Sequence, residues 1–95
     1  MIFPKDLEVV RRTKSFSAAT MPAKLGTAHD TAAGVWARIV VELGSLTFTD
    51  CRFSDSPVRL GVGAHDRIEP QVAHFVTPDP DCVFHLELLR RREEA

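Results

Sequence analysis

The alternation of apolar and polar residues along the chain predicts short β-strands rather than helices. In residues 34–53 the alternation runs through Val35, Ala37, Ile39 and Val41, breaks at the turn Leu43-Gly44-Ser45, and resumes with Leu46 and Phe48. A period of two is the spacing of side chains on one face of a strand, and a glycine turn between two such runs is typical of a β-hairpin. We therefore expect a hairpin over residues 34–53.

Similar patterns recur along the rest of the chain. In 57-PVRLGVG-63, Val58, Leu60 and Val62 fall on one face and Arg59 on the other, as in a half-buried strand. Further strands are expected at Leu7–Arg12, 71–76 and 83–90. Helix signals are poor, since Pro22 interrupts the alanine-containing stretch 17–25. These short strands separated by turns predict an all-β sandwich or small barrel.

Length and composition limit the classes of protein that need to be considered. With 95 residues, of which 44% are apolar, the chain fits a single domain over 1–95. Its formal charge of −1 gives no basic surface for nucleic acid or anionic membrane. The start, MIFPKDLEVVRR, lacks the apolar core of a signal peptide, so we expect a cytoplasmic protein. In that compartment Cys51 and Cys82 are expected to remain ordinary thiols.

Histidines inside apolar runs are the candidate functional residues. Extending the inward parity of Val35 and Ile39 backward places His29 and Thr31 on the inner face, if no bulge intervenes. His74 shares its parity with flanking valines, so it faces inward if they do. At this stage His29 could instead lie in a surface turn, and His74 could be a hydrogen-bonded core histidine rather than a metal ligand or proton-transfer group.

The last predicted strand separates two kinds of side chain. Phe84, Leu86 and Leu88 form its expected core face, which leaves His85 and Glu87 together on the opposite face, solvated or at an interface. A bulge or the reverse choice of face would bring both toward the interior. We expect His65, in the loop 61–70, to be exposed.

No motif of a known catalytic class is present. The sequence contains no GxSxG, HExxH, Walker or GxGxxG pattern. What remains is a site with two or three imidazoles and an optional carboxylate. Such ligands suit zinc, iron, nickel or manganese.

An ordered series of short motifs resembles a known family. The series is Arg12-Thr13-x-x-Phe16, Thr20-x-Pro22-x-x-Leu25, His29-x-Thr31-x-x-Gly34-Val35-Trp36, Leu43-Gly44-x-Leu46-x-Phe48, Pro70-x-x-x-His74 and Phe84-x-Leu86-Glu87-Leu88. In its order and spacing over nearly the whole chain, it resembles the small cupin-like domain family of tellurite-resistance protein B and YeaR. The resemblance implies a cupin-like jelly roll of short antiparallel strands. Some members carry a methyltransferase, for which this chain is too short.

The resemblance also implies a metal site, in reduced form. Cupins generally bind metal through an HxH plus Glu motif and a later histidine. Here His29 is similar to the first histidine and His74 to the later one, while Thr31 and Ala37 stand where the second histidine and the glutamate would be. Water, His85 or Glu87 would have to complete such a site.

Three functional hypotheses follow. The first is a cupin-like protein of undefined activity that binds a divalent metal through His29, His74 and Glu87, with a role in tellurite or other oxyanion stress. The second is a metal-free module that binds or senses a small molecule or anion, in which histidines act as hydrogen-bond donors and Trp36 helps to set the shape of the site. Its ligand-binding residues are Thr31, Trp36 and His85. The third is a homodimeric structural domain without a site, in which the outer face of the last strand meets a partner subunit.

Overall fold

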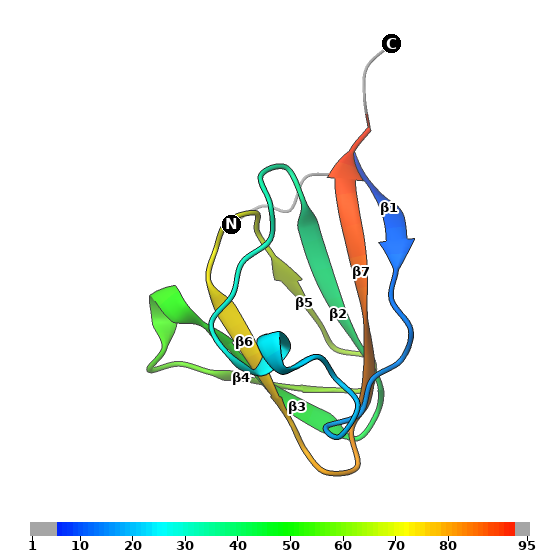
Figure 1. The fold of residues 1–95 in the computed structure, drawn as a ribbon, viewed down its shortest axis with the longest axis vertical. Coiled ribbons are helices and arrows are strands. Elements are labelled where there is room, and N and C mark those ends of the chain that lie inside the picture. Colours follow the sequence, from blue (N-terminus) through cyan, green and yellow to red (C-terminus); the bar gives the residue numbers. More distant parts are fainter. Residues whose placement is uncertain (1–5, 93–95) are drawn as a thin grey trace.

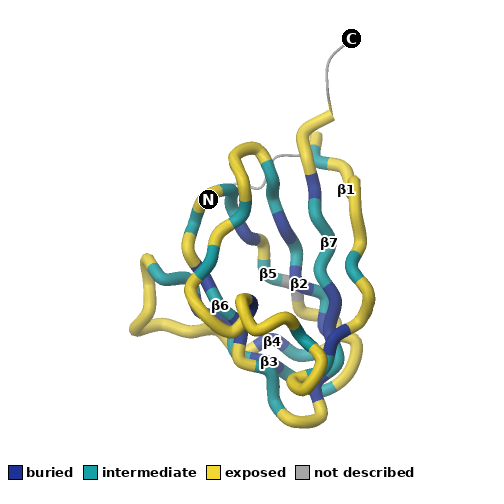
Figure 2. The backbone as a smooth tube through the Cα atoms, viewed as in Figure 1, coloured by how far each residue is buried: buried dark blue, intermediate teal, exposed yellow. Residues whose placement is uncertain are grey.

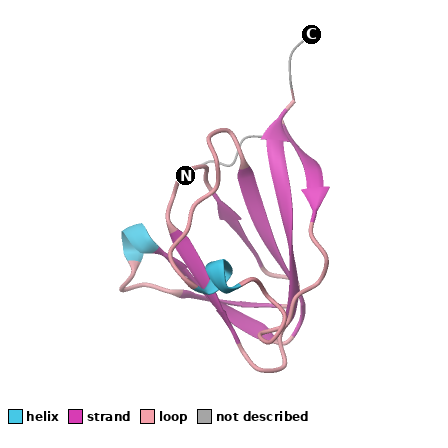
Figure 3. Cartoon of the chain, viewed as in Figure 1, coloured by secondary structure: helices cyan, strands magenta, loops and turns pink. Residues whose placement is uncertain are grey.

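The computed structural model describes residues 6–92 and confirms the all-β fold class. Besides the strands it contains only two short 3-10 helices in this range, as Figure 3 shows. In chain order the elements are β1 (Leu7–Arg12), η1 (Ala23–Gly26), β2 (Trp36–Leu43), β3 (Ser45–Asp50), η2 (Cys51–Phe53), β4 (Val58–Gly61), β5 (His65–Ile68), β6 (His74–Pro78) and β7 (Val83–Arg91). Neither helix, nor any other in the described range, is long and apolar enough to cross a membrane.

The strands form two antiparallel sheets (Figure 1). Sheet A has the order β1-β7-β2-β5, and sheet B has the order β4-β3-β6. Buried residues gather where the sheets face each other (Figure 2). Alternation explains this core, because Ala37, Ile39 and Val41 on β2 turn to the same side. The other buried members are Phe16, Leu25, Leu46, Phe48, Leu60, Ile68, Val76, Cys82 and Phe84.

The predicted hairpin over residues 34–53 is wrong. β2 pairs with β7 and β5 in sheet A, whereas β3 pairs with β4 and β6 in sheet B. Gly44 has a φ of 69°, and a Cβ atom there would lie 3.1 Å from the Cα atom of Cys82. At this glycine the chain crosses from sheet A to sheet B, and the positive φ and the close contact leave little room for a side chain. Apolar and polar residues alternate in the same way whether two successive strands pair with each other or lie in opposite sheets. The sequence pattern therefore did not distinguish a hairpin from a crossing between sheets.

Other strand boundaries also differ from the prediction. β5 occupies His65–Ile68, where we expected a loop. The strand expected over 71–76 begins only at His74, because Gln71 lies in a turn with a φ of 60°. On β4 only Leu60 is buried, while Val58 and Val62 remain 45% and 65% exposed.

β1 contains a β-bulge at Val10, and the alternation of inward and outward side chains is reversed on the two sides of this bulge. Val9 pairs with Leu89 on the outer face of sheet A, and Arg11 pairs with Leu88 on the inner face. Val10 is the extra residue between them, and such an insertion reverses the parity of a strand. Without the bulge Val10 would face the interior, so the bulge is what turns Arg11 inward.

Candidate functional site

A cavity of about 290 Å³ opens between the two sheets next to η1. A second, much smaller hollow shares His29 and His74 with it and is also lined by Ile39 and Val76 of the core. The walls are mainly apolar, with polar and charged groups at a few positions. The lining residues are Arg11, Thr13, Phe16, Pro22, Lys24, Leu25, His29, Asp30, Thr31, Ala37, Ile68, His74, Leu86 and Leu88.

His29 and His74 meet inside this cavity, as the sequence predicts, although by a different route. His29 lies outside β2 and forms an isolated antiparallel bridge with His74, the first residue of β6. Their backbones exchange two hydrogen bonds, of 3.1 and 2.9 Å. Residues directly opposite in such a pair place their side chains on the same face. The ring centroids are accordingly 4.3 Å apart, in an edge-to-face arrangement.

Each of these imidazoles has one nitrogen bonded to the backbone. Nδ1 of His29 lies 2.9 Å from the carbonyl oxygen of Thr27, and Nδ1 of His74 lies 2.7 Å from that of Val72. A carbonyl only accepts, so Nδ1 carries the proton in both rings and Nε2 of a neutral ring keeps a lone pair. Within residues 6–92 neither Nε2 has a protein partner, and no buried polar side-chain atom is left unsatisfied, so both Nε2 atoms remain accessible.

His74 is the deeper of the two histidines. It is only 3% exposed, and its ring centroid lies 5.9 Å from that of Phe48. Burial lowers the pKa of His74 below its usual value of 6.5, although the hydrogen bond to Val72 opposes this shift. His74 is therefore neutral at pH 7 and offers Nε2 as a hydrogen-bond acceptor or a metal ligand.

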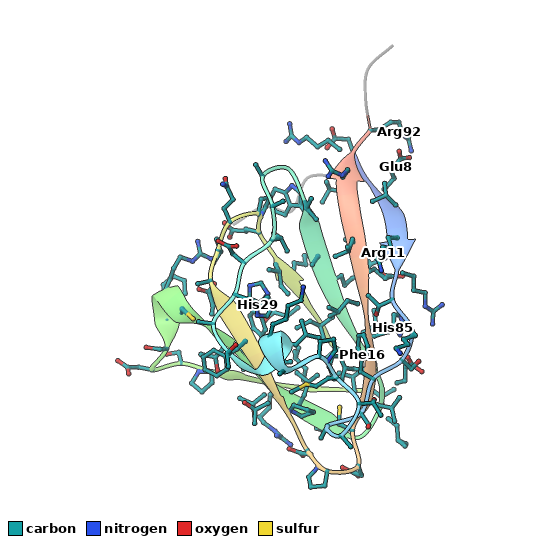
Figure 4. All side chains as sticks on the ribbon, viewed as in Figure 1. Glu8, Arg11, Phe16, His29, His85 and Arg92 are labelled. Carbon is teal, nitrogen blue, oxygen red and sulfur yellow. The ribbon has the colours of Figure 1, made fainter. Side chains whose placement is uncertain are left out.

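The rim of the cavity is charged. Arg11 reaches it from β1 (Figure 4) and Lys24 from η1, and both are exposed. Asp30, next to His29 in the chain, is the carboxylate on the same lining. Thr31 lies there too, with its hydroxyl donating to the carbonyl of Val35 at 2.7 Å, so its oxygen can still accept a bond from a ligand.

Glu87, His85 and Trp36 are not brought to this cavity. They lie on the outer face of sheet A, where Trp36 pairs with Leu89. Glu87 accepts a 2.7 Å hydrogen bond from Nε of Arg38. Of the predicted metal and ligand residues, only His29, Thr31 and His74 share the cavity. The described residues contain no group of three or more His, Cys, Asp or Glu side chains placed to hold a metal ion.

His85 belongs to a separate cluster on the outer face. It is 4% exposed, and its Nδ1 donates to Oε2 of Glu42 over 2.6 Å. Ser15 donates to the same oxygen over 2.6 Å. The hydrogen bonds from Ser15 and then His85 lower the pKa of the Glu42 carboxyl. Glu42 reaches them from a register shift between Val41 and Leu43, and sequence alternation gives no sign of that shift.

Trp36 lines a second hollow, of about 400 Å³, near η2. There the guanidinium of Arg52 bonds to the carboxylates of Asp50 and Glu69. These charges neutralise one another within the chain, which makes this hollow a weaker candidate than the histidine cavity.

Arg11 and Lys24 are the site residues that the sequence analysis missed. Both occur among scattered basic residues that read as solvated surface. A single sequence contains no pattern that predicts a one-residue bulge, so Arg11 could not be assigned to the inner face. For η1 the sequence offers only the short segment 22-PAKLG-26, in which Leu25 is the buried residue.

Comparison with known proteins confirms the family resemblance. The model of the TehB-like domain family matches residues 11–86. TehB from Haemophilus influenzae superimposes with a TM-score of 0.83 at 21% identity, over 92% of this chain and 32% of that one. This chain therefore spans about a third of the length of that TehB. No curated protein matches the sequence.

Two further solved structures have related folds. A protein from Escherichia coli K12 superimposes with a TM-score of 0.84 at 18% identity, over 98% of this chain and 99% of that one. A cupin-2 domain-containing protein from Shewanella frigidimarina gives a TM-score of 0.54 at 17% identity, over 96% and 76%. At these identities the likeness concerns the fold, and it confirms the cupin-like architecture.

Proposed function

We propose that this chain, which belongs to the TehB-like domain family, binds a small molecule in the cavity between its two sheets. The observation that carries the proposal is the pair His29 and His74, whose Nε2 atoms remain for a ligand once each Nδ1 has bonded to the backbone. Apolar walls with a few convergent polar groups are the usual form of a small-molecule site. The imidazoles would orient the ligand, and the walls would supply most of its contact.

The protonation of the pair indicates which group of the ligand they contact. A neutral imidazole that donates through Nδ1 can only accept at Nε2. The preferred partner is therefore a hydroxyl or amine hydrogen of the ligand. Lowering the pH below the pKa of His74 would convert Nε2 to a donor and weaken that contact.

A divalent metal is the second candidate, and the same bonds favour it. Histidines that bind a metal usually donate their other N–H to a carbonyl or carboxylate, as His29 and His74 do here. Zinc sites use three or four protein ligands, however, and among the residues that the structure describes only two imidazoles come together here. Water or a bound small molecule would have to complete the coordination of zinc, iron, nickel or manganese, because Glu87 faces away.

Nitrogen NMR of the histidine rings tests both candidates. We would titrate protein labelled with ¹⁵N-histidine with phenol, as a neutral hydroxyl donor, and separately with Zn²⁺ alone. The expected result is a saturable shift of Nε2 in His29 and His74, while His85 stays unchanged as an internal control. If neither probe moves the two resonances at millimolar concentration, the proposed function is wrong.

Matched variants locate the effect. His74→Phe keeps an aromatic ring in the core but has no Nε2, so it should abolish the shift of His29. His85→Gln, on the outer face, should leave the titration unchanged. Elemental analysis of tag-free protein separates the candidates, because stoichiometric metal that His29→Ala and His74→Ala both remove would favour the metal. A role in tellurite or other oxyanion stress stays a prediction from the family alone.

A further inference from the structure

The rim of the histidine cavity carries two cations, Arg11 and Lys24. Several guanidinium groups elsewhere have carboxylate partners, as in Arg38 with Glu87 and Arg59 with Asp79. Arg11 and Lys24 form no ion pair within residues 6–92. Charges that already neutralise each other leave little for a ligand, whereas these two can still bind an anion.

The position of Arg11 is specific to the cavity. The bulge at Val10 turns Arg11 to the inner face, opposite Leu88, which itself lines the cavity. Bulges commonly re-aim a side chain at a functional site. Arg12, the next residue, lies opposite Glu87 in the strand register, on the outer face. Two adjacent arginines on one strand thus serve opposite faces, and only Arg11 lines the cavity.

The lining of the cavity therefore has three parts. The first holds the exposed cations, with Asp30 as the carboxylate among them. The second is an apolar wall, to which Phe16, Leu86 and Leu88 contribute. The third is the histidine pair, where His74 is 3% exposed and, with Nδ1 bonded to the carbonyl of Val72, leaves Nε2 to accept a hydrogen bond from a ligand.

We propose that the ligand is a small organic anion with a hydroxyl group at its far end: the anion binds Arg11 and Lys24, the apolar body lies along the wall, and the hydroxyl donates to the histidine pair. This inference rests on the proposed function, since it uses the same cavity, and adds the charge and polarity of the ligand. A cavity of about 290 Å³ restricts the class to molecules the size of a single ring or a short chain.

A set of closely related probes tests the inference one group at a time. The probes are 4-hydroxybenzoate, which has both groups, benzoate, which lacks the hydroxyl, and phenol, which lacks the carboxylate. Binding is followed by the Nε2 shifts of His29 and His74 at low ionic strength. We expect 4-hydroxybenzoate to bind about tenfold more tightly than either of the others, because each polar contact at a partly exposed site is worth roughly one power of ten.

Variants on β1 and η1 assign the carboxylate contact. Arg11→Gln and Lys24→Gln should each weaken 4-hydroxybenzoate about tenfold and leave phenol unchanged. Arg12→Gln and Lys14→Gln are the matched controls, and neither should alter the affinity. Asp30→Asn removes the rim carboxylate and should tighten 4-hydroxybenzoate severalfold. Raising the salt concentration should weaken 4-hydroxybenzoate but not phenol, since exposed charges are screened.

The outcomes separate this inference from the proposed function. If phenol and 4-hydroxybenzoate bind equally, or Arg11→Gln and Arg12→Gln behave alike, the anionic ligand class is wrong while the pocket stands. If benzoate binds as tightly as 4-hydroxybenzoate, the hydroxyl contact with the histidines is wrong. If no probe moves the imidazole resonances, the proposed function itself fails. An unchanged backbone spectrum of each variant confirms that it is folded.

Discussion

Two equally buried histidines differ in their partners: His74, on β6 of sheet B, faces the space between the sheets, and His85, on β7, lies on the outer face of sheet A. On the inner side His74 donates to the carbonyl of Val72, among apolar neighbours. On the outer side His85 donates to the carboxylate of Glu42, which Ser15 also bonds. The ring of His74 lines a cavity, whereas that of His85 is packed against its own chain. Equal burial therefore does not mean equal availability to a ligand.

The difference between the two histidines reflects a difference in charged groups between the cavity and the outer face of sheet A. On the outer face Arg38 and Glu87 form an ion pair across adjacent strands. Between the sheets, by contrast, the rings of His29 and His74 bond to backbone carbonyls rather than to carboxylates. A ligand would meet unpaired acceptors on the inner face alone. Each prediction below tests one part of this contrast.

The inner face should dominate stability. Phe84 is fully buried on β7 and packs on Phe16 with ring centroids 5.8 Å apart. We expect Phe84→Ala to cost about 3–5 kcal/mol of unfolding free energy. Leu89→Ala, on the outer face of the same strand, should cost only about 2 kcal/mol because its neighbour Val9 is already half exposed. Urea denaturation measures both, and equal losses would mean that the outer face has a core of its own.

The glycine that separates the sheets should come next in effect. Gly44→Ala forces a side chain into a positive φ and within 3.1 Å of the Cα atom of Cys82, which we expect to cost about 2 kcal/mol. Gly61→Ala is the matched control, because its Cβ would meet only the hydroxyl of Ser45, at 3.6 Å. Thermal unfolding compares the two variants. Similar melting temperatures would show that the passage between sheets tolerates a side chain.

The two histidine environments should respond differently to acid. The pKa of His74 is lowered in the folded protein, so the unfolded chain binds the proton more readily. Its contribution to stability is therefore complete above pH 6.5 and decreases as the pH falls from 6.5 toward the folded pKa. Titration of its ring by NMR should give a midpoint below 6.5. A midpoint at or above 6.5 would mean that the cavity does not desolvate the ring.

The outer-face cluster of Ser15, Glu42 and His85 should affect stability at lower pH than His74 does, and by a smaller amount. The pKa of Glu42 is lowered by the hydrogen bonds from Ser15 and His85, so its contribution is present above pH 4.5 and is lost as the pH falls through the folded pKa. Glu42→Gln should reduce the acid dependence of unfolding below pH 4.5. Asp55→Asn, which alters an exposed carboxylate, provides the control. Identical acid profiles for all three proteins would remove the link between this cluster and stability.

Much of the fold was predictable because alternation reports directly which side of a strand is buried. The strands at Leu7–Arg12 and 83–90 were found in nearly their observed positions, and Phe84 falls on the expected core face. Which strands pair is a different question, and alternation alone does not answer it. The strand at His65–Ile68 was missed because three of its four residues are polar. Ile68, which is buried, is too short a signal for an apolar alternation.

The site was predictable where it depends on residue type and less so where it depends on register. His29 and His74 were identified, but through the parity of a strand that begins only at Trp36. The bridge between them depends on how distant segments pair, which one sequence does not encode in its local pattern. Arg11 illustrates the same limit, because the single extra residue Val10 decides which face it occupies.

The central position of β7 has a consequence for the protein during its synthesis. β7 lies between β1 and β2 and pairs with both, yet it follows all the other described strands in the sequence and leaves the ribosome after them. Until residues 83–91 emerge, the inner edges of β1 and β2 have no partner strand in sheet A. Pairings between distant segments form slowly, and open strand edges promote aggregation. The order of the strands along the chain therefore leaves these two edges open until residues 83–91 are available to pair with them.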